Sequence, residues 1–224
     1  MVDFYNCETK RFTEAKKKST NLKTNDFINT DETKISWSSS LIPKLEKGEK
    51  AIFEKDKINI GLYRPYFKQY LYRGDKMIHR RGQFEEFFPT PKTENLLICV
   101  PGIGGNKPYS VIISDNIVDL NSLEAGTQCF PLYYYEENKT IQKGLFDDVS
   151  SDSSSNYTRR DAVSDFILDR AKKQYGLSAS SKTAMKKEDI FYYVYGFLHS
   201  KEYRETFVND LKKMLPRLPL VDDV

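Results

Sequence analysis

The chain has 224 residues and a formal net charge of +3, from 35 Lys and Arg against 32 Asp and Glu. Hydrophobic residues make up 39% and aromatic residues 13% of the chain, which excludes a disordered polypeptide and provides for a globular core. A balance so close to neutrality does not by itself indicate nucleic-acid binding, so the distribution of charge along the chain matters more than its sum.

Residues 1–50 are predicted to be an N-terminal helical and extended connecting segment. Within residues 1–24 an amphipathic helix would turn Phe4, Phe12 and Ala15 inward and leave its Lys and Arg side chains in solvent. The polar stretch that follows surrounds the single tryptophan, Trp37. We expect extended chain there, with one short helix near Leu41–Leu45.

Residues 51–136 are predicted to be a β-rich unit. Lys57–Tyr63 alternates apolar and polar residues with period two, and Leu96–Val100 is a continuous apolar run, which is typical of a buried strand. Pro65 interrupts the first run and predicts an edge or a bend. The other expected strands are Phe67–Tyr72, Tyr109–Ser114 and Phe130–Tyr135.

Residues 137–160 are polar and rich in serine, and they predict a flexible loop. Residues 161–224 predict a helical unit, because apolar residues there recur at helical spacing. Ser200 can cap the last helix and Pro216 would stop it. The fold class expected from this order is α+β, a β-rich recognition unit followed by a small helical unit. The expected stripes are Ala162, Phe166, Ile167, Ala171 and Tyr175; Ile190, Tyr193, Val194, Phe197 and Leu198; and Tyr203, Phe207, Leu211, Met214 and Leu215.

Motifs for catalysis or metal binding are missing from the sequence. His79 lies beside two arginines, which oppose its protonation, and His199 ends an apolar helical stripe. No G-x-S-x-G, H-E-x-x-H or C-x-x-C sequence occurs, and Gly102–Gly105 indicates a tight turn with positive φ rather than a phosphate loop. We therefore expect no enzyme activity and no metal site. A metal-dependent nuclease using Asp115 and Asp119 is the weakest alternative.

The cysteines and the N-terminus bear on where the protein acts. Cys7, Cys99 and Cys129 are an odd, widely spaced set, which fits a reducing compartment. The first residues lack the pattern of a signal peptide, and no apolar run reaches 18 residues. We expect a cytoplasmic protein without a membrane partner.

Positive charge gathers between Glu54 and Gly82, where eight basic residues face three acidic ones. Four tyrosines, Tyr63, Tyr66, Tyr70 and Tyr72, lie among them. Cations neutralise phosphates, and Arg, Asn or Gln can read base edges. This composition is equally compatible with a solvated edge hairpin whose tyrosines pack on the sheet.

A series of short segments in fixed order resembles one known family, the C-terminal region of type ISP restriction–modification enzymes, often labelled predicted helicases. The resemblance runs from about residue 30 to residue 220. The segments that carry it are Lys34–Ser38, Tyr63–Tyr66, Tyr70–Tyr72, Gly102–Gly104, Lys107–Tyr109, Gln128–Tyr133, Lys187–Gly196, Glu202–Glu205 and Leu215–Pro219.

The resemblance implies a role in a larger protein. In that family one polypeptide carries a nuclease, an ATP-driven translocase, an adenine-N6 methyltransferase and a C-terminal target recognition domain. The chain resembles the last of these, and it contains neither an Asn-Pro-Pro-Tyr/Phe motif nor a Walker A sequence. The implied partners are double-stranded DNA and the adjacent methyltransferase domain. S-adenosylmethionine, ATP and Mg are implied only for the other domains, and no cofactor is expected here.

The segments that identify the family are rich in scaffold residues, so we expect the base-reading residues to lie between them. Arg64 is expected to be a buried or half-buried hydrogen-bonding anchor. The alternative function is a helical protein–protein interaction module of the same complex, without autonomous DNA binding. The residues expected to contact DNA are Lys68, Lys76 and Lys107 at phosphates; Arg73, Arg80, Arg81 and Gln83 at base edges in the major groove; and His79 and Asn106 as further groove contacts.

Overall fold

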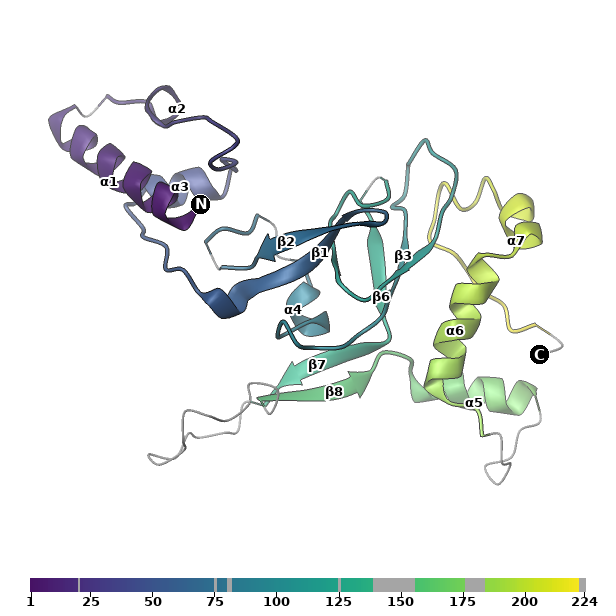
Figure 1. Cartoon of the computed structure of the whole chain (residues 1–224). Coiled ribbons are helices and arrows are strands. Elements are labelled where there is room, and N and C mark those ends of the chain that lie inside the picture. The colour runs from purple at the N-terminus through teal and green to yellow at the C-terminus, as the bar shows by residue number, and fades with distance from the viewer. Residues whose placement is uncertain are drawn as a thin grey trace, which may run out of the picture. The chain divides into compact units, whose positions relative to one another are not determined.

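The computed structural model describes residues 1–19, 21–74, 76–79, 82–124, 126–138, 156–175 and 184–221 (Figure 1). These residues form two compact units, one of residues 1–59 and 71–82, the other of residues 60–70 and 83–224. Helices and three small sheets are both present, so the α+β fold class is confirmed. The predicted boundary at residue 50 does not coincide with this division, because residues 51–59 and 71–82 belong to the first unit.

The first unit is built on α1 (Val2–Lys18), which packs on α3 (Leu41–Glu46) across a shared apolar core. Asp3 in the first turn and lysines in the last turn of α1 complement the helix dipole. A short helix, α2 (Thr24–Phe27), lies between them in the chain. The predicted helices near residues 1–24 and 41–45 are confirmed. The core side chains are Val2, Tyr5, Phe12, Ile28, Ile35, Leu41, Leu45 and Ala51.

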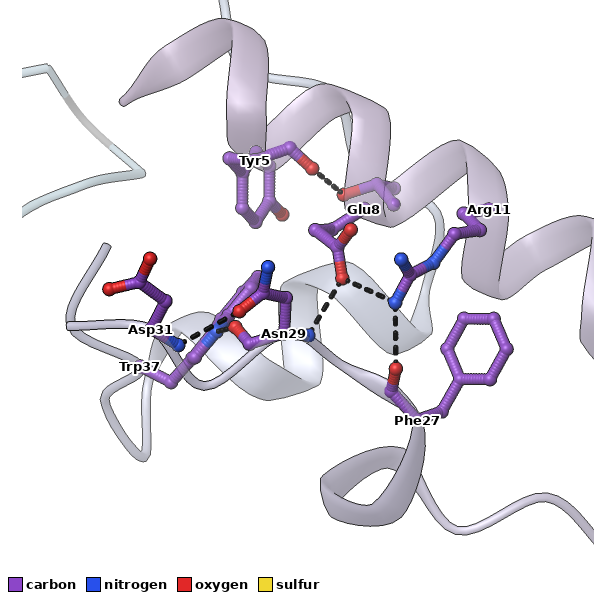
Figure 2. A network of polar contacts seen from close by, with 8 residues as sticks. Tyr5, Glu8, Arg11, Phe27, Asn29, Asp31 and Trp37 are labelled. Atoms are coloured by element: carbon purple, nitrogen blue, oxygen red, sulfur yellow. Dashed lines mark hydrogen bonds and ion pairs between the residues drawn. The ribbon is translucent and has the colours of Figure 1, made fainter. Parts of the chain in front are cut away.

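A polar network joins α1 to the chain segment that follows α2 in the first unit (Figure 2). Glu8 is only 4% exposed, yet its carboxylate pairs with Arg11 at 2.9 Å and accepts the Asn29 backbone N–H at 2.9 Å. Arg11 also donates to the Phe27 carbonyl at 2.7 Å, and the Trp37 indole donates to the Asn29 carbonyl at 2.8 Å. The buried charge is therefore compensated, and it fastens residues 27–29 to the helix.

The second unit has a buried strand at its centre, β3 (Leu97–Val100), with all four residues buried. It pairs antiparallel with β4 (Ile112–Ser114) and β6 (Gln128–Pro131). Ile98 and Val100 pack against helix α6 (Lys187–Leu198) in one apolar cluster. A continuous apolar run is what burial on both faces requires, so the predicted buried strand is confirmed.

A further sheet combines β1 (Ile58–Arg64), β2 (Phe67–Tyr72) and β5 (Ile117–Val118) in the order β2–β1–β5. Strand β5 runs parallel to β1, with Gly61 opposite Ile117 and Leu62 opposite Val118. Both predicted strands of the hairpin are confirmed, and β2 has the predicted bounds. The two-residue strand β5 and the short helix α4 (Phe84–Phe87) had no sequence signal strong enough to predict them.

The prediction of a flexible loop over residues 137–160 is wrong at its C-terminal end. Residues Tyr157–Asp161 form β8, which pairs antiparallel with β7 (Tyr133–Glu137). Diagonal cross-strand contacts stabilise this pair of strands in the absence of an alternating apolar pattern. Arg160 pairs with Glu136 at 3.0 Å, and Arg159 lies 4.3 Å from the centre of the Tyr133 ring. Residues 139–155 of the predicted loop lie outside the described residues.

The helical part differs from the prediction in two places. α5 (Asp165–Gln174) begins with the Ser164 cap, but of its predicted inward stripe only Ala171 is buried, and Phe166 is 70% exposed. α7 (Lys201–Thr206) starts at the predicted Ser200 cap and ends before Phe207 instead of continuing to residue 215. Turns follow through residues 208–210, where β-branched, Asn and Asp residues are weak helix formers. The stripe of α6 is confirmed.

The Glu8 network gives a stability prediction for the first unit. Glu8→Ala should lower the free energy of unfolding by about 2 kcal/mol, because it removes a buried side chain together with the acceptor of the Asn29 N–H and the ion-pair partner of Arg11. Urea unfolding followed by the fluorescence of Trp37, the single tryptophan, measures the change within this unit. Glu14→Ala, at an exposed position of the same helix, is the control and should be near neutral. Equal effects of the two variants would contradict the role given to Glu8.

The second unit gives a pH prediction. The Tyr133 hydroxyl donates to the Glu188 carboxylate, and this hydrogen bond, aided by partial burial, raises the pKa of Tyr133 to about 12. A pKa raised in the folded state means that the contribution to stability is complete below pH 10 and is lost as the pH rises towards 12. Tyr133→Phe should therefore cost about 1 kcal/mol at pH 8, and the difference from wild type should shrink above pH 10. Tyr134→Phe on the same strand is the control, and a difference that does not depend on pH would contradict the assignment.

Candidate nucleic-acid interface

The distal part of the β1–β2 hairpin, residues 63–70, is exposed on both faces of its ribbon and is called the hairpin tip below. All of Phe67, Lys68, Gln69 and Tyr70 are exposed, although their side chains alternate between faces. Among them Tyr70 is 82% exposed. Aromatic side chains that find no cover on either face of a strand indicate a contact surface rather than a core.

The turn that joins β1 to β2 consists of Pro65 and Tyr66 alone. Tyr66 has φ of 64°, in the left-handed region, and its side chain is 93% exposed. Proline followed by a residue with positive φ is the pattern of a type II turn, whose second central position favours glycine. Tyr66 thus holds a strained backbone conformation while its ring projects into solvent.

Two cations of the hairpin tip are each held by one carboxylate. Arg64 pairs with Asp119 at 3.0 Å, donates to its neighbour's carbonyl and lies 3.9 Å from the centre of the Tyr63 ring. Lys68 pairs with Asp115 at 2.9 Å, and this contact holds the pKa of Asp115 below its usual range. The tip is therefore braced by both ends of β5, since Asp115 precedes and Asp119 follows that strand.

The segment between β5 and β6 also supports the turn after β3. The Glu124 carboxylate accepts the backbone N–H of Lys107 at 2.7 Å, and the Glu124 carbonyl accepts that of Gly102 at 2.9 Å. A Cβ on Gly105 would lie 2.8 Å from the Glu124 carboxylate, so a larger residue there would displace this side chain from its contact with Lys107. Gly104 has φ of 87°, and the predicted tight turn is confirmed. Asp119 and Glu124 thus connect the hairpin tip with the 102–107 turn.

Within the second unit, four of the residues predicted to contact DNA lie on exposed positions: Lys68, Gln83, Asn106 and Lys107. Gln83 precedes α4 and makes no capping hydrogen bond with its side chain. Arg64 forms the hydrogen bonds expected of an anchor, but its side chain is exposed instead of half-buried. Contact of these residues with DNA stays a prediction.

Three other predicted residues, Arg73, Lys76 and His79, belong to the first unit. Arg73 is only 2% exposed, so in this conformation its guanidinium does not face solvent and cannot reach a groove. Lys76 pairs with Glu49 at 3.3 Å, and His79 Nδ1 lies 3.1 Å from the Ser40 hydroxyl. Arg80, Arg81 and residues 139–155 lie outside the described residues.

The sequence prediction missed Tyr66, Gln69 and Tyr70 as candidate contacts. It left the tyrosines open between nucleic-acid contact and packing on the sheet, and in the structure the first four residues of β2 are exposed. The signal available was a two-residue Pro-Tyr turn between strands, where a bulky residue stands in a position that favours glycine.

The residues that the structure describes contain no group of three or more His, Cys, Asp or Glu side chains arranged to hold a metal ion. Cys99 and Cys129 lie opposite each other on β3 and β6, with sulfurs 3.6 Å apart, and are free thiols. None of the helices described here has the length and apolar character needed to cross a membrane.

Comparison with known proteins places this geometry in a family. The family model described as the Type ISP C-terminal specificity domain matches residues 1–224. A comparison with curated protein sequences gives no significant match.

Three solved structures are similar to the chain over nearly its whole length. The Type ISP restriction–modification enzyme LlaBIII bound to DNA matches with 28% identity, a TM-score of 0.72 and 97% of this chain covered. A nuclease-deletion mutant of the Type ISP enzyme LlaGI with a DNA substrate mimic matches with 29% identity, a TM-score of 0.69 and 98% coverage. A DrdV–DNA complex matches with 27% identity, a TM-score of 0.74 and 97% coverage.

The matched region is a small part of each of those proteins, namely 12% of the LlaBIII chain, 14% of the LlaGI chain and 18% of the DrdV chain. The likeness thus concerns one domain of much longer polypeptides. Because the family model covers every residue of the sequence, the chain belongs to the Type ISP C-terminal specificity domain family.

Proposed function

We propose that the chain recognises a specific sequence in double-stranded DNA as the target recognition domain of a type ISP restriction–modification enzyme. The observation that carries this proposal is the match of the whole chain to the specificity-domain family, together with its likeness to three proteins solved with DNA. Recognition positions the DNA for adenine-N6 methylation, and for translocation and cleavage, by other domains of the protein.

The role of this chain is binding and not chemistry. A neighbouring methyltransferase domain flips the adenine and uses S-adenosylmethionine, while ATP and Mg serve the translocase and nuclease. The domain works in the cytoplasm, next to the DNA it reads. Its family description as a specificity domain supports this division of labour.

The second unit offers both kinds of contact that sequence recognition needs. Lys107 lies exposed on a turn held by Glu124, which suits a phosphate contact that sets the register of the protein on the duplex. Asn106 and Gln83, also exposed, have amides that can pair with an adenine edge. The ion pairs of Arg64 and Lys68 are exposed and weak, so phosphates can compete with Asp119 and Asp115 for these cations.

One observation favours the alternative, a helical interaction module. Phe166 and Ile167 on α5 are exposed instead of joining the core, and an exposed apolar helix face is typical of a docking surface. This face suits contact with the adjacent methyltransferase domain. A docking role for this face is compatible with DNA binding by the same chain. It becomes the main function only if the chain does not bind DNA.

Selection from a randomised duplex pool tests the proposed function. The purified chain is incubated with the pool at low and near-physiological salt, and retained duplexes are sequenced. We expect enrichment of a motif of several base pairs, with affinity that falls steeply as salt rises. Retention without enrichment contradicts sequence recognition, and no retention by a folded chain favours the interaction module.

A matched pair of variants assigns the phosphate contact. Lys107→Gln should keep the motif and reduce the slope of log affinity against log salt by about one. Lys201→Gln, at an exposed lysine of α7, is the control and should leave the slope unchanged.

A further inference from the structure

The hairpin tip is an exposed two-stranded ribbon, a form that can enter a groove of DNA. The major groove of B-DNA is about 12 Å wide and admits a two-stranded β-ribbon. Residues 63–70 form such a ribbon, and their side chains are exposed on both of its faces. A ribbon packed on its own protein would bury one face, so this exposure leaves both faces for a partner.

The composition of the tip favours DNA as that partner. Residues 60–70 include two cations and no carboxylate, so the ribbon itself does not repel phosphates. Its cations are held at the sides by Asp115 and Asp119, whereas Tyr66, Gln69 and Tyr70 project from the end of the ribbon and its outer strand. The amide of glutamine matches the N6 and N7 atoms of adenine, and a ring can pack on base edges and thymine methyl groups.

The backbone conformation of Tyr66 also supports a contact with a partner. A left-handed conformation is strained for tyrosine and unstrained for glycine, and the ring that the strained position carries is almost fully exposed. The ring therefore contributes nothing to the core in return for that strain. A contact between the Tyr66 ring and a partner molecule would offset the cost of this strained conformation.

Resting on the proposed function, we propose that the hairpin tip enters the major groove of the target duplex, where Gln69 reads an adenine and the Tyr66 ring packs against neighbouring bases. This contact contributes sequence specificity, in addition to the affinity that the phosphate contacts provide. Gln69 sets the preferred base at one position of the motif, while Tyr66 contributes affinity. Lys68 exchanges Asp115 for a phosphate beside the ribbon.

The test uses the full chain and the motif that wild type selects. Gln69→Ala should lose the preference for adenine at one position and keep the rest of the motif. Replacing that adenine by 7-deazaadenine removes the major-groove N7 acceptor, one of the two hydrogen bonds of the contact, and should weaken wild-type binding roughly 2- to 12-fold. The same replacement should leave the affinity of Gln69→Ala unchanged, because the contact is already absent.

Tyr66→Gly separates the ring from the fold. Glycine suits the positive φ, so the variant should be at least as stable to heat as wild type while its affinity for the selected duplex falls by roughly tenfold or more. Tyr192→Ser removes an aromatic ring that is 51% exposed elsewhere in the same unit, and it should not change the affinity.

The outcomes separate this inference from the proposed function. A wild-type motif that both hairpin variants select unchanged, with wild-type affinity, overturns the groove contact and leaves DNA recognition intact; the tip is then a protein contact. Loss of affinity in Tyr66→Gly accompanied by unfolding also contradicts the role of the ring. A wild-type chain that selects no motif overturns both proposals.

Discussion

The pairing of β3 with its two neighbours is the constraint on which the second unit depends. Leu97–Val100 is buried on both faces, so β4 and β6 must lie along it with every backbone group paired. Strand β4 leads directly to Asp115, and the chain reaches Asp119 after the two residues of β5 that pair with β1. The core strands therefore determine the positions of the carboxylates that pair with Arg64 and Lys68. Through these ion pairs the exposed hairpin is attached to the core sheet.

The same arrangement is compatible with the proposed binding of DNA by a nearly neutral protein. Charge is not concentrated in one patch, since many of the basic side chains that the structure describes lie beside carboxylates. Exposed pairs of this kind are individually weak, so a phosphate can replace the carboxylate without a large loss. In the proposed function, specificity depends on amides and rings that project from turns and the hairpin tip, and affinity depends on the exchange of ion partners.

Much of the fold could be predicted from the sequence because local signals and burial agree there. The apolar run at Leu97–Val100, the alternation before Pro65 and the Ser200 cap each produce the element they predict. The sequence could not predict β8, whose stability comes from cross-strand pairs with β7 instead of an apolar pattern. It also predicted too long a helix after Tyr203, because spacing alone does not register the weak helix formers that follow.

The candidate site was less predictable, for a physical reason. The basic stretch from residue 54 to residue 82 is continuous in sequence but is divided between two units, and Arg73 is buried. The sequence gives the number of cations and tyrosines in this stretch. The exposure of each side chain depends on how its strand packs against the core. Tyr66 and Gln69 became candidates only through their exposure and through the backbone conformation of the turn.

Photocrosslinking of the full chain to its selected duplex tests the central claim most directly. Thymines of the motif are replaced one at a time by 5-iodouracil, whose iodine takes the place of the methyl group in the major groove. Irradiation followed by peptide mapping identifies the segment in contact. We expect a crosslink at Tyr66 or Tyr70 from at least one position of the motif. Efficient crosslinks confined to other segments would contradict it.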